Sequence, residues 1–493
     1  MPVPPEPRVV VIGGGFAGLA AADRLTAAGA GPAGAAAPRV VLLDPAPALG
    51  GVVQTVRRDG WLVERAADNV LASRPEAIAL FERLGLAAEI VPVRPEARRA
   101  LVFHGGRPLP VPTGFRLLAP GDAAGIRATA LLSDAGKARL LAERDVPARR
   151  DTDDESLESF AVRRLGREAF DRLVQPLVAG IWTADPSRLS MDAACPEFVA
   201  MEREHGSLSV AEERRLAGLS ADHRGTGARY GQFVTLGGGL GSVVDRAVGR
   251  LAAAGVTLVP ERAGSVTPRP EGGYRVALVG PAGGCIDADG VVVALPSPAA
   301  ASVLGSVDAA LATDLAAIEH ADSVVVALGY RRDRVAHPLD AAGMVVPRVE
   351  GRAALAVSFA SSKFAGRAPE GHVLLRVFFG GALDPERARL DDAEIVHLAR
   401  RELALLLGAE GAPALVEVAR WPGAMPQYHL GHRDRVARIG RRIAAWRGLA
   451  LAGAAYDGVG IPQVIGSGLK AAEEVLTALV RHAADAGGAS PRG

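Results

Sequence analysis

Several short apolar runs along the chain have the pattern of strands buried on both faces of a sheet. Residues 8–12 and 39–43 are almost continuous runs of valine, leucine and isoleucine, without the polar alternation of a strand that has one wet face. Similar runs occupy residues 289–296 and 449–453, far along the chain. Because such runs are typical of parallel strands, the pattern predicts one parallel sheet assembled from distant segments.

A glycine motif follows the first run directly. Gly13, Gly15 and Gly18 form the spacing GxGxxG between the expected strand and an alanine- and leucine-rich helix. In this motif the first glycine permits a tight turn, the second lets the backbone approach a pyrophosphate, and the third lets helix and strand pack closely. The N–H groups of the first helical turn, near Phe16 and Ala17, then face the phosphates. The segment therefore predicts a nucleotide-binding site.

Two further features follow, of which the second favours FAD over NAD as that nucleotide. The second strand ends in Asp44, whose carboxylate can accept hydrogen bonds from a ribose diol. Beyond it, Gly50 and Gly51 form a double glycine that we expect to place a second loop over the phosphates. Residues 28–38 are rich in glycine, alanine and proline, and are expected to form a surface loop.

Later segments complete the nucleotide domain in this interpretation. Residues 233–251 have the pattern of a strand, a glycine turn and a helix, and residues 256–296 contain three further short strands. Near the C-terminus, the run at 449–453 is followed by a glycine-rich stretch and by a helix expected over 469–479. A helix N-terminus that is entered through glycines can face the electron-rich edge of a flavin.

The chain is therefore expected to be an α/β protein with a Rossmann-like nucleotide domain and two inserted domains. The nucleotide domain is expected in three pieces, 1–75, 215–296 and 421–485. Residues 76–214 are expected to form a helical domain, and residues 297–420 a substrate-binding domain that mixes strands and helices.

Smaller expectations follow from local signals. The acidic run at 151–155 is expected to cap a solvated helix over 157–165. A strand is expected at 323–329 and a helix at 392–407. The last residues, 486–493, are expected to be a disordered tail.

The composition narrows the classes of partner. Lys+Arg and Asp+Glu number 56 and 55, so neither a nucleic-acid-binding tail nor a polybasic patch is indicated, and all but three of the basic residues are arginine. Cys195 and Cys285 lack disulfide or metal-ligand spacing, so no metal site is expected. Residues 9–22 are uncharged but fall short of the ~20 residues that a membrane span needs. We expect a cytoplasmic protein.

Three longer motifs make the chain resemble a known family. They are Gly180-Ile-Trp-Thr-Ala-Asp-Pro-Ser-Arg-Leu-Ser190 with Met201-Glu-Arg-Glu-His-Gly-Ser-Leu208, Arg420-Trp-Pro-Gly-Ala-Met-Pro-Gln-Tyr-His-Leu-Gly-His432, and Ala452-Gly-Ala-Ala-Tyr-Asp-Gly-Val-Gly-Ile-Pro462. In these motifs the chain resembles, nearly end to end, the flavin-dependent protoporphyrinogen and coproporphyrinogen III oxidases of haem biosynthesis.

The resemblance implies a fold, a cofactor and a reaction. The fold is that of the amine-oxidase-like flavoproteins, with FAD-binding, substrate-binding and helical domains, and the helical domain implies peripheral contact with the inner face of the cell membrane. The reaction is the six-electron oxidation of coproporphyrinogen III or protoporphyrinogen IX, with three O2 consumed and three H2O2 formed. Because the cofactor carries such chemistry, no catalytic side chain is expected. A homodimer is a further expectation, although the sequence itself gives no oligomeric state.

Motif and resemblance together indicate the site residues. Gly180 is implied to offer its backbone to a pyrrole ring, Val345 and Phe378 to form apolar walls, and Arg99 to contact substrate. Val345 and Phe378 can equally be ordinary core residues. The cofactor residues indicated are Gly13, Gly15, Phe16, Ala17, Gly18, Asp44, Gly50, Gly51, Val266 through its backbone, Trp421 near the isoalloxazine, Gly453, Gly458, Val459, Gly460 and Ile461.

The sequence departs from the family pattern at three positions. Asp44 stands where glutamate is usual, and Ala48 and Ala100 where arginine is usual. The arginine at the last position would pair with a substrate propionate. Arg99 is its neighbour, but a shift of one residue turns a side chain to the opposite face of a strand. The altered carboxylate contact favours coproporphyrinogen III slightly over protoporphyrinogen IX.

Other interpretations stay open. The chain could be another flavoprotein of the same fold, an amine oxidase or a carotenoid desaturase, or a non-enzymatic binding protein of the haem pathway. Residues 115–118 and 137–141 could present apolar side chains to a bilayer or could face the core. His429 and His432 could suggest a metal, but no third ligand is in view. Tyr428 and His432 are expected instead to fix a loop by hydrogen bonding.

Overall fold

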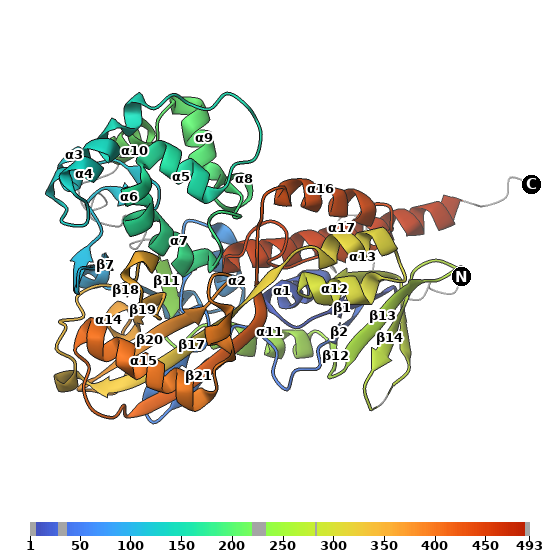
Figure 1. Cartoon of the computed structure of the whole chain (residues 1–493). Coiled ribbons are helices and arrows are strands. Elements are labelled where there is room, and N and C mark those ends of the chain that lie inside the picture. The colour runs from blue at the N-terminus through green and yellow to red at the C-terminus, as the bar shows by residue number, and fades with distance from the viewer. Residues whose placement is uncertain (1–5, 28–36, 219–232, 282, 489–493) are drawn as a thin grey trace, which may run out of the picture.

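The computed structural model describes residues 6–27, 37–218, 233–281 and 283–488, with the side chains of 482–488 left aside. Figure 1 shows three regions: a parallel sheet with its covering helices, a second sheet of mostly antiparallel strands, and a group of helices above that second sheet. No helix in the described ranges is long and apolar enough to cross a membrane.

A five-stranded parallel sheet forms the centre of the first region, as the apolar runs predict. Its strands, in spatial order, are β12 (Thr257–Val259), β2 (Arg39–Leu43), β1 (Arg8–Ile12), β16 (Gly290–Val293) and β22 (Leu449–Leu451). Valines alternate between the two faces, so Val9 and Val11 enter one core while Val10 and Ile12 enter the other. Burial on both faces explains why these strands carry no polar alternation.

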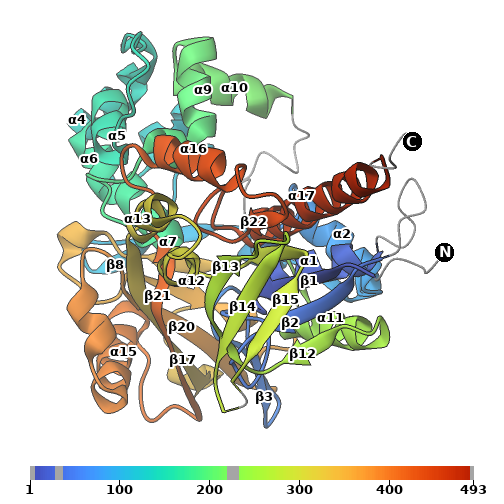
Figure 2. The ribbon, with the colours of Figure 1, turned by 90° about the vertical axis from the view of Figure 1, so that its right-hand side faces the viewer.

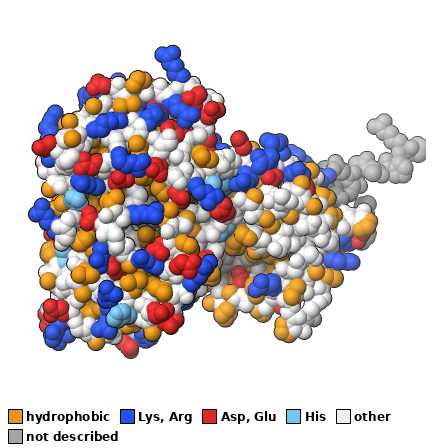
Figure 3. Space-filling view, viewed as in Figure 1, with side chains coloured by type: hydrophobic (Ala, Val, Ile, Leu, Met, Phe, Trp, Pro, Cys, Tyr) orange, Lys and Arg blue, Asp and Glu red, His pale blue; other side chains and the backbone are white. Residues whose placement is uncertain are grey.

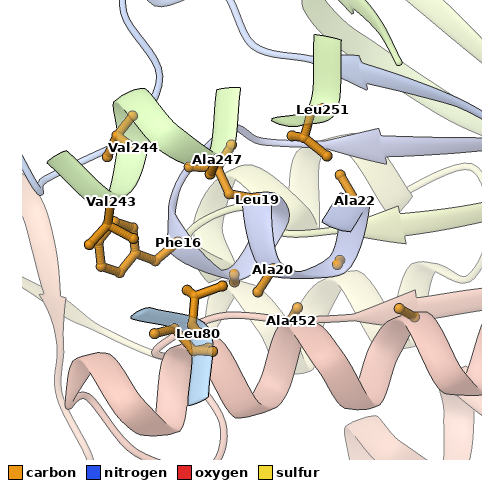
Figure 4. Packing of buried hydrophobic residues seen from close by; sticks show 14 of the residues in the cluster. Phe16, Leu19, Ala20, Ala22, Leu80, Val243, Val244, Ala247, Leu251 and Ala452 are labelled. Atoms are coloured by element: carbon orange, nitrogen blue, oxygen red, sulfur yellow. The ribbon is translucent and has the colours of Figure 1, made fainter. Parts of the chain in front are cut away.

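Three helices cover one face of this sheet. They are α1 (Phe16–Thr26), α11 (Gly241–Ala253) and α17 (Ile461–Gly488), with α2 (Pro75–Arg83) beside them. Figure 4 shows Leu19 and Ala22 of α1 facing Ala247 and Leu251 of α11. The glycine motif therefore lies at the N-terminus of the central helix of this layer.

The other face is covered by a small sheet, which Figure 2 shows beside β1 and β2, and by three helices. The antiparallel strands β13 (Arg262–Pro268), β14 (Tyr274–Val279) and β15 (Cys285–Ala288) form the sheet. The helices are α12 (Ser297–Leu304), α13 (Ala309–Ala316) and α16 (His432–Ile443).

The second region is a seven-stranded sheet. Its strands, in spatial order, are β21 (Leu415–Pro426), β17 (His320–Arg331), β20 (His372–Gly380), β19 (Ala356–Phe359), β18 (Gly343–Val345), β7 (Ala100–His104) and β8 (Arg107–Pro110). Helix α15 (Asp392–Leu407) packs on one face, and α14 (Ala360–Lys363) follows β19. The segment expected to be helical thus contributes β7 and β8 to this sheet, and β21 runs across the boundary expected at residue 420.

Helices dominate the third region. They are α3 (Ala123–Ala128), α4 (Asp134–Leu141), α5 (Leu157–Leu165), α6 (Arg167–Ala169), α7 (Gln175–Trp182), α8 (Met191–Ala194), α9 (Pro196–His205) and α10 (Leu208–Ala217). The hairpin of β9 (Phe115–Arg116) and β10 (Ala119–Pro120) lies against α10. Figure 1 shows α7 between these helices and the seven-stranded sheet.

Short strands join the first two regions. The hairpin β3 (Thr55–Arg58) and β4 (Trp61–Glu64) follows the second glycine loop. A three-stranded sheet combines β5 (Val70–Leu71), β11 (Phe233–Leu236) and β6 (Ile90–Pro92).

The acidic run at 151–155 does not provide the N-cap of the helix at 157–165, so this prediction is wrong. Ser156 is the N-cap of α5, and its side chain accepts from the amide of Ser159 at 3.2 Å. Asp154 of the acidic run instead accepts from the hydroxyl of Ser190 at 2.8 Å and from the amide of Gly431 at 2.9 Å. The carboxylate joins two segments that are remote in sequence, which a local capping rule does not anticipate.

The C-terminal helix begins earlier than predicted. It starts at Ile461, so Gly466 and Gly468 lie inside α17 and not in a loop. A Cβ at Gly468 would lie 2.1 Å from the carbonyl oxygen of Ala17 in α1, so glycine serves here to let two helices touch. Residues 486–488 of the expected tail continue this helix, whereas 489–493 and most of the loop expected at 28–38 lie outside the described residues.

The segments considered for membrane contact place most of their large apolar side chains in the core. Phe115 and Leu118 of the first segment are buried, and so is Leu140 of the second. Leu117 and Leu141 are half-buried. On the face that Figure 3 shows, basic and acidic side chains are interspersed over the two regions built from the helices and the seven-stranded sheet.

Candidate active site

The turn after β1 is compact on one side and open on the other. Gly13 has φ +106°, and a Cβ there would lie 2.4 Å from the carbonyl oxygen of Ala294. A Cβ at Gly18 would lie 1.8 Å from the carbonyl oxygen of Gly13, so helix and turn are in direct backbone contact. Around Gly15, in contrast, a Cβ would meet nothing within 4 Å. Phe16 and Ala17 follow as the first two residues of α1, and no side chain caps the helix.

The second glycine loop lies against this open side. The amide of Gly50 donates to the carbonyl oxygen of Gly14 at 2.8 Å, and Gly50 and Gly15 form an isolated parallel bridge. A Cβ at Gly51 would be 3.3 Å from Cα of Gly15. Two backbone segments free of side chains thus border one space, which is the arrangement a pyrophosphate requires.

Asp44 stands at the carboxyl end of β2, next to both loops. Its carboxylate accepts from the amide of Gly14 at 2.6 Å and from the amide of Ala46 at 2.8 Å. A carboxylate has about four acceptor positions, so it retains capacity for the hydroxyls of a ribose. Ala48 is exposed and supplies no cation nearby.

The segment from Gly453 to Ile461 leads from β22 into the N-terminus of α17. Gly453 and Gly458 have φ of +132° and +134°. The amide of Gly453 donates to the hydroxyl of Ser467 at 2.9 Å. Val459 and Gly460 are half-buried, and Ile461 is the first residue of the helix. The two glycine-led helices, α1 and α17, pack against each other.

The motif that ends β21 supports this segment. The ring of Tyr428 stacks on the ring of His432 with centroids 3.9 Å apart, and its hydroxyl donates to the carbonyl oxygen of Ala454 at 2.6 Å. Burial, and then the charge of Arg435, lowers the pKa of His432 to about 4, so this imidazole is neutral at pH 7. Within the described ranges, no three His, Cys, Asp or Glu side chains are grouped to hold a metal.

Trp421 and Val266 have different surroundings. The indole Nε1 of Trp421 donates to the carbonyl oxygen of Arg65 at 3.0 Å, and the guanidinium of Arg65 lies 5.8 Å from its ring centre. The side chain of Val266 is fully buried in the core beneath the parallel sheet. Any contact of Val266 with a cofactor therefore has to come from its backbone.

A cavity of about 410 Å³ lies between α7 and the seven-stranded sheet. It brings together Gly180 of α7, Val345 of β18 and Phe378 of β20, three of the four residues indicated for substrate. A Cβ at Gly180 would be 3.9 Å from Cγ1 of Val345, so the two walls are close here. Other apolar side chains that line the cavity are Leu117, Leu177, Ile181, Met344 and Val357.

Arg99 is not brought to this cavity. Its Nε donates to the carbonyl oxygen of Asp340 at 2.7 Å, and its guanidinium forms an ion pair with the Asp340 carboxylate. Ala100, the next residue, lines the cavity instead. Because neighbouring residues of an extended segment point to opposite sides, Arg99 does not take the place of an arginine at position 100.

One corner of the cavity was missed by the sequence reasoning. Asn69, Ser358 and Lys363 line it and give it polar groups in a mainly apolar wall. Lys363 is buried, although lysine is rarely found inside a protein without a partner. The one available signal was the scarcity of lysine in a chain whose basic residues are nearly all arginine.

A sequence model of the family described as flavin containing amine oxidoreductase matches residues 16–476 of the chain. The chain belongs to the flavin-containing amine oxidoreductase family. It is 33% identical over 482 residues to the coproporphyrinogen III oxidase of Bacillus subtilis, covering 96% of this chain and 98% of the relative. A second relative, from Propionibacterium freudenreichii and with the same name, is 33% identical and is covered to 91%. The chloroplastic protoporphyrinogen oxidase of Nicotiana tabacum is 28% identical and is covered to 86%.

Solved structures agree with this assignment. A crystal structure from Exiguobacterium sp. 255-15, of a protein provisionally assigned as a protoporphyrinogen oxidase, superposes with a TM-score of 0.83 at 28% identity, covering 97% of this chain and 99% of that one. Reduced UDP-galactopyranose mutase superposes with a TM-score of 0.70 at 17% identity, over 96% of both chains, and shares the fold.

FAD is the cofactor of this family member. The residues present fit it, because a Cβ at Gly15 would meet nothing within 4 Å, and Gly51 faces Gly15 without a side chain. The uncapped N-terminus of α1 offers N–H groups to phosphate oxygens. Asp44 lies beside both glycine loops and keeps acceptor positions that a ribose could use. The chain is therefore a flavin-dependent oxidoreductase of amine-oxidase-like fold, as the motifs indicated.

Proposed function

We propose that this oxidoreductase converts a porphyrinogen to the corresponding porphyrin, with coproporphyrinogen III as the preferred substrate. The observation that carries the proposal is the cavity beneath α7, which unites Gly180, Val345 and Phe378 from three distant segments. Relatives that share 33% of their residues with almost the whole chain are named coproporphyrinogen III oxidases. Mainly apolar walls suit a large macrocycle that is apolar apart from its carboxylates.

The same proposal assigns the cofactor contacts. Backbone N–H groups at the start of α1 and in the second glycine loop bind the pyrophosphate, Asp44 binds the ribose, and the N-terminus of α17 faces the flavin ring. When bound, FAD supplies a two-electron acceptor. The residues assigned to this role are Gly13, Gly15, Phe16, Ala17, Gly18, Asp44, Gly50, Gly51, Val266, Trp421, Gly453, Gly458, Val459, Gly460 and Ile461.

The protein's own part in the reaction is to bind and orient the substrate. Val345 and Phe378 pack against the macrocycle and exclude water, and the backbone at Gly180 leaves room for a pyrrole ring. The porphyrinogen loses six hydrogens in three two-electron oxidations. Three O2 are reduced to three H2O2, which balances both electrons and protons. No side chain is required to carry electrons.

The test uses the purified, FAD-loaded protein. Anaerobically prepared coproporphyrinogen III and protoporphyrinogen IX are added under air, and the Soret band and H2O2 are followed together against a boiled-protein control. We expect three H2O2 per porphyrin and a higher kcat/KM for coproporphyrinogen III. A flavin-loaded protein inactive on both compounds, but active on amines or phytoene, would contradict the proposal.

Three expectations about the protein's surroundings accompany it: a cytoplasmic location, contact with the inner face of the cell membrane, and a homodimer. Leu117 and Leu141 are the larger apolar side chains of the two segments considered that are left partly exposed. Flotation with anionic vesicles tests the membrane contact, with loss of binding expected in a Leu141→Glu variant. Sedimentation velocity tests the dimer.

A further inference from the structure

The polar corner of the cavity is held together by one buried carboxylate. Asp68 accepts from the ammonium of Lys363 at 2.5 Å and lies 3.0 Å from the guanidinium of Arg376. The amide of Asn69 donates to the same carboxylate at 2.6 Å. The hydroxyl of Ser358 is 3.5 Å from it. Three of these four donors, Asn69, Ser358 and Lys363, also line the cavity.

Buried cations outnumber buried carboxylates in this corner. Lys363, Arg367 and Arg376 all lie behind or beside the cavity wall and are almost fully buried. The carboxylates near them are Asp68 and Glu64, and burial raises the pKa of Glu64. Since an uncompensated charge is costly away from water, such a corner is stabilised by a further anion.

Lys363 keeps unused hydrogen-bond donors at the cavity. An ammonium group has three N–H donors, and Asp68 is the one hydrogen-bond acceptor it meets in the described part of the chain. Arg376 also donates to the carbonyl oxygen of Ala66, although its buried Nε has no hydrogen-bond partner among the described residues. Arg367 donates to backbone oxygens around Leu236. Lys363 alone among the three cations lines the cavity.

A second cation at the cavity has a different environment. Arg116 donates to the buried carboxylate of Glu212 at 3.0 Å and lies 3.2 Å from Glu197. Arg215 completes this group by pairing with Glu212. Two cations and two carboxylates balance there, so nothing at Arg116 calls for an added anion.

We propose that Lys363 binds a propionate carboxylate of the substrate, with Asp68 holding the ammonium in place. The inference rests on the porphyrinogen oxidation proposed above. Propionates are the only anionic groups of a porphyrinogen, and a charge-assisted hydrogen bond to an ammonium is among the stronger contacts a carboxylate can make. Coproporphyrinogen III carries a propionate on each of its four pyrrole rings, so every in-plane orientation presents one to this corner. Protoporphyrinogen IX carries two, so Lys363 favours the tetracarboxylate.

The test compares a porphyrin acid with its ester. Coproporphyrin III and its tetramethyl ester are titrated, in the same detergent buffer, into FAD-loaded wild type and into the variants Lys363→Met and Lys363→Arg. The methionine replaces the chain as far as Cε and removes the charged amine, and Arg376 is left to pair with Asp68 in that variant. Lys137→Met is the matched control, because Lys137 lies on α4 and pairs with Asp134 at 3.6 Å.

We expect Lys363→Met to weaken binding of the free acid by about tenfold or more, the loss of one charge-assisted contact. Binding of the ester is expected to stay within about twofold of wild type. Lys363→Arg is expected to recover part of the affinity for the acid, and Lys137→Met to change neither ligand. In turnover, KM for coproporphyrinogen III rises in Lys363→Met while kcat changes little, because the contact is made before and during the reaction alike.

The inference is overturned if acid and ester lose affinity equally in Lys363→Met, or if neither does. It is also overturned if that variant loses its flavin absorbance while still distinguishing acid from ester. The positive charge of Lys363 would then contribute to FAD binding and not to substrate binding. Lys363→Gln replaces the methionine variant if the latter does not fold, as judged by its melting temperature. Wild-type protein that oxidises neither porphyrinogen defeats the proposed function, whereas active protein whose discrimination ignores residue 363 defeats this inference alone.

Discussion

The amide of Gly458 donates a hydrogen bond of 2.9 Å to the hydroxyl of Tyr428. That hydroxyl donates in turn to Ala454, so a single buried oxygen fixes both ends of the segment that leads into α17. Tyr428 lies just beyond the end of β21, which ends at Pro426. The side chain connects the seven-stranded sheet to the backbone proposed to face the flavin.

Removing this hydroxyl tests the connection. We expect Tyr428→Phe to lower the free energy of unfolding by about 1–3 kcal/mol, because a buried N–H and a buried carbonyl each lose a partner. FAD affinity should fall as well, measured by flavin fluorescence during dialysis. Tyr274→Phe is the control, since its hydroxyl donates to Arg447 at 2.8 Å on the outer side of the parallel sheet. Equal FAD loss in both variants would remove Tyr428 from this role.

A methyl group between α1 and α17 should be costly. Gly468→Ala places a Cβ against the carbonyl oxygen of Ala17, and we expect it to destabilise the protein by about 3 kcal/mol, although alanine normally favours a helix. Gly440→Ala in α16 has open space around its Cβ and should stabilise by up to about 1 kcal/mol. Urea unfolding of the two variants measures whether each substitution lowers or raises the free energy of unfolding. A stable Gly468→Ala protein would mean that the helices can separate at no cost.

Acid should weaken the fold through His432. Its folded pKa of about 4 lies below the ordinary value of about 6.5, so the unfolded state takes up a proton first as the pH falls. The stabilisation is complete above pH 6.5 and declines towards pH 4, by about 3 kcal/mol for this one group. Urea unfolding at pH 7, 5.5 and 4.5 measures the slope. His432→Gln should have a shallower slope than wild type, whatever its stability at pH 7, and an unchanged slope would count against the assignment.

Substrate kinetics should separate Arg99 from the cavity wall. Arg99 pairs with Asp340 outside the cavity, so Arg99→Ala is expected to change KM for coproporphyrinogen III by less than about twofold. Phe378→Ala removes a wall and is expected to raise KM by about tenfold or more. Steady-state assays of both variants measure these KM values. A large increase in KM for Arg99→Ala with a normal melting temperature would indicate that Arg99 contacts the substrate after all.

Local patterns predicted the parallel sheet well and its covering helix less well. Residues 8–12 form β1 as expected, because an unbroken β-branched run suits only a strand buried on both faces. The predicted start of α17 is wrong, because the local pattern treats Gly466 and Gly468 as loop residues although both lie inside the helix. Gly468 has to be glycine because of its contact with α1, which no local rule contains.

In the candidate site too, one part could be predicted from local sequence and another part could not. The backbone around Gly13 and Gly15 follows from spacing within a few residues, so the sequence indicates it directly. The proposed role of Lys363 depends on its pairing with Asp68 and on the nearby Arg376, and these residues come from other segments of the chain. Only the folded chain brings these charges together, and for that reason composition could flag the lysine but not explain it.

The spatial order of the parallel sheet also has a consequence for how the chain is made. The last strand, β22, and the helix α17 come from the final tenth of the sequence, yet they border β16 and cover α1 near the beginning. A chain still emerging from the ribosome therefore exposes part of the apolar face of its first helix until residues 449–481 have been made. Such late pairing favours slow folding and capture by chaperones. Expression at reduced temperature should raise the yield of FAD-loaded protein, and truncation before residue 449 should leave none.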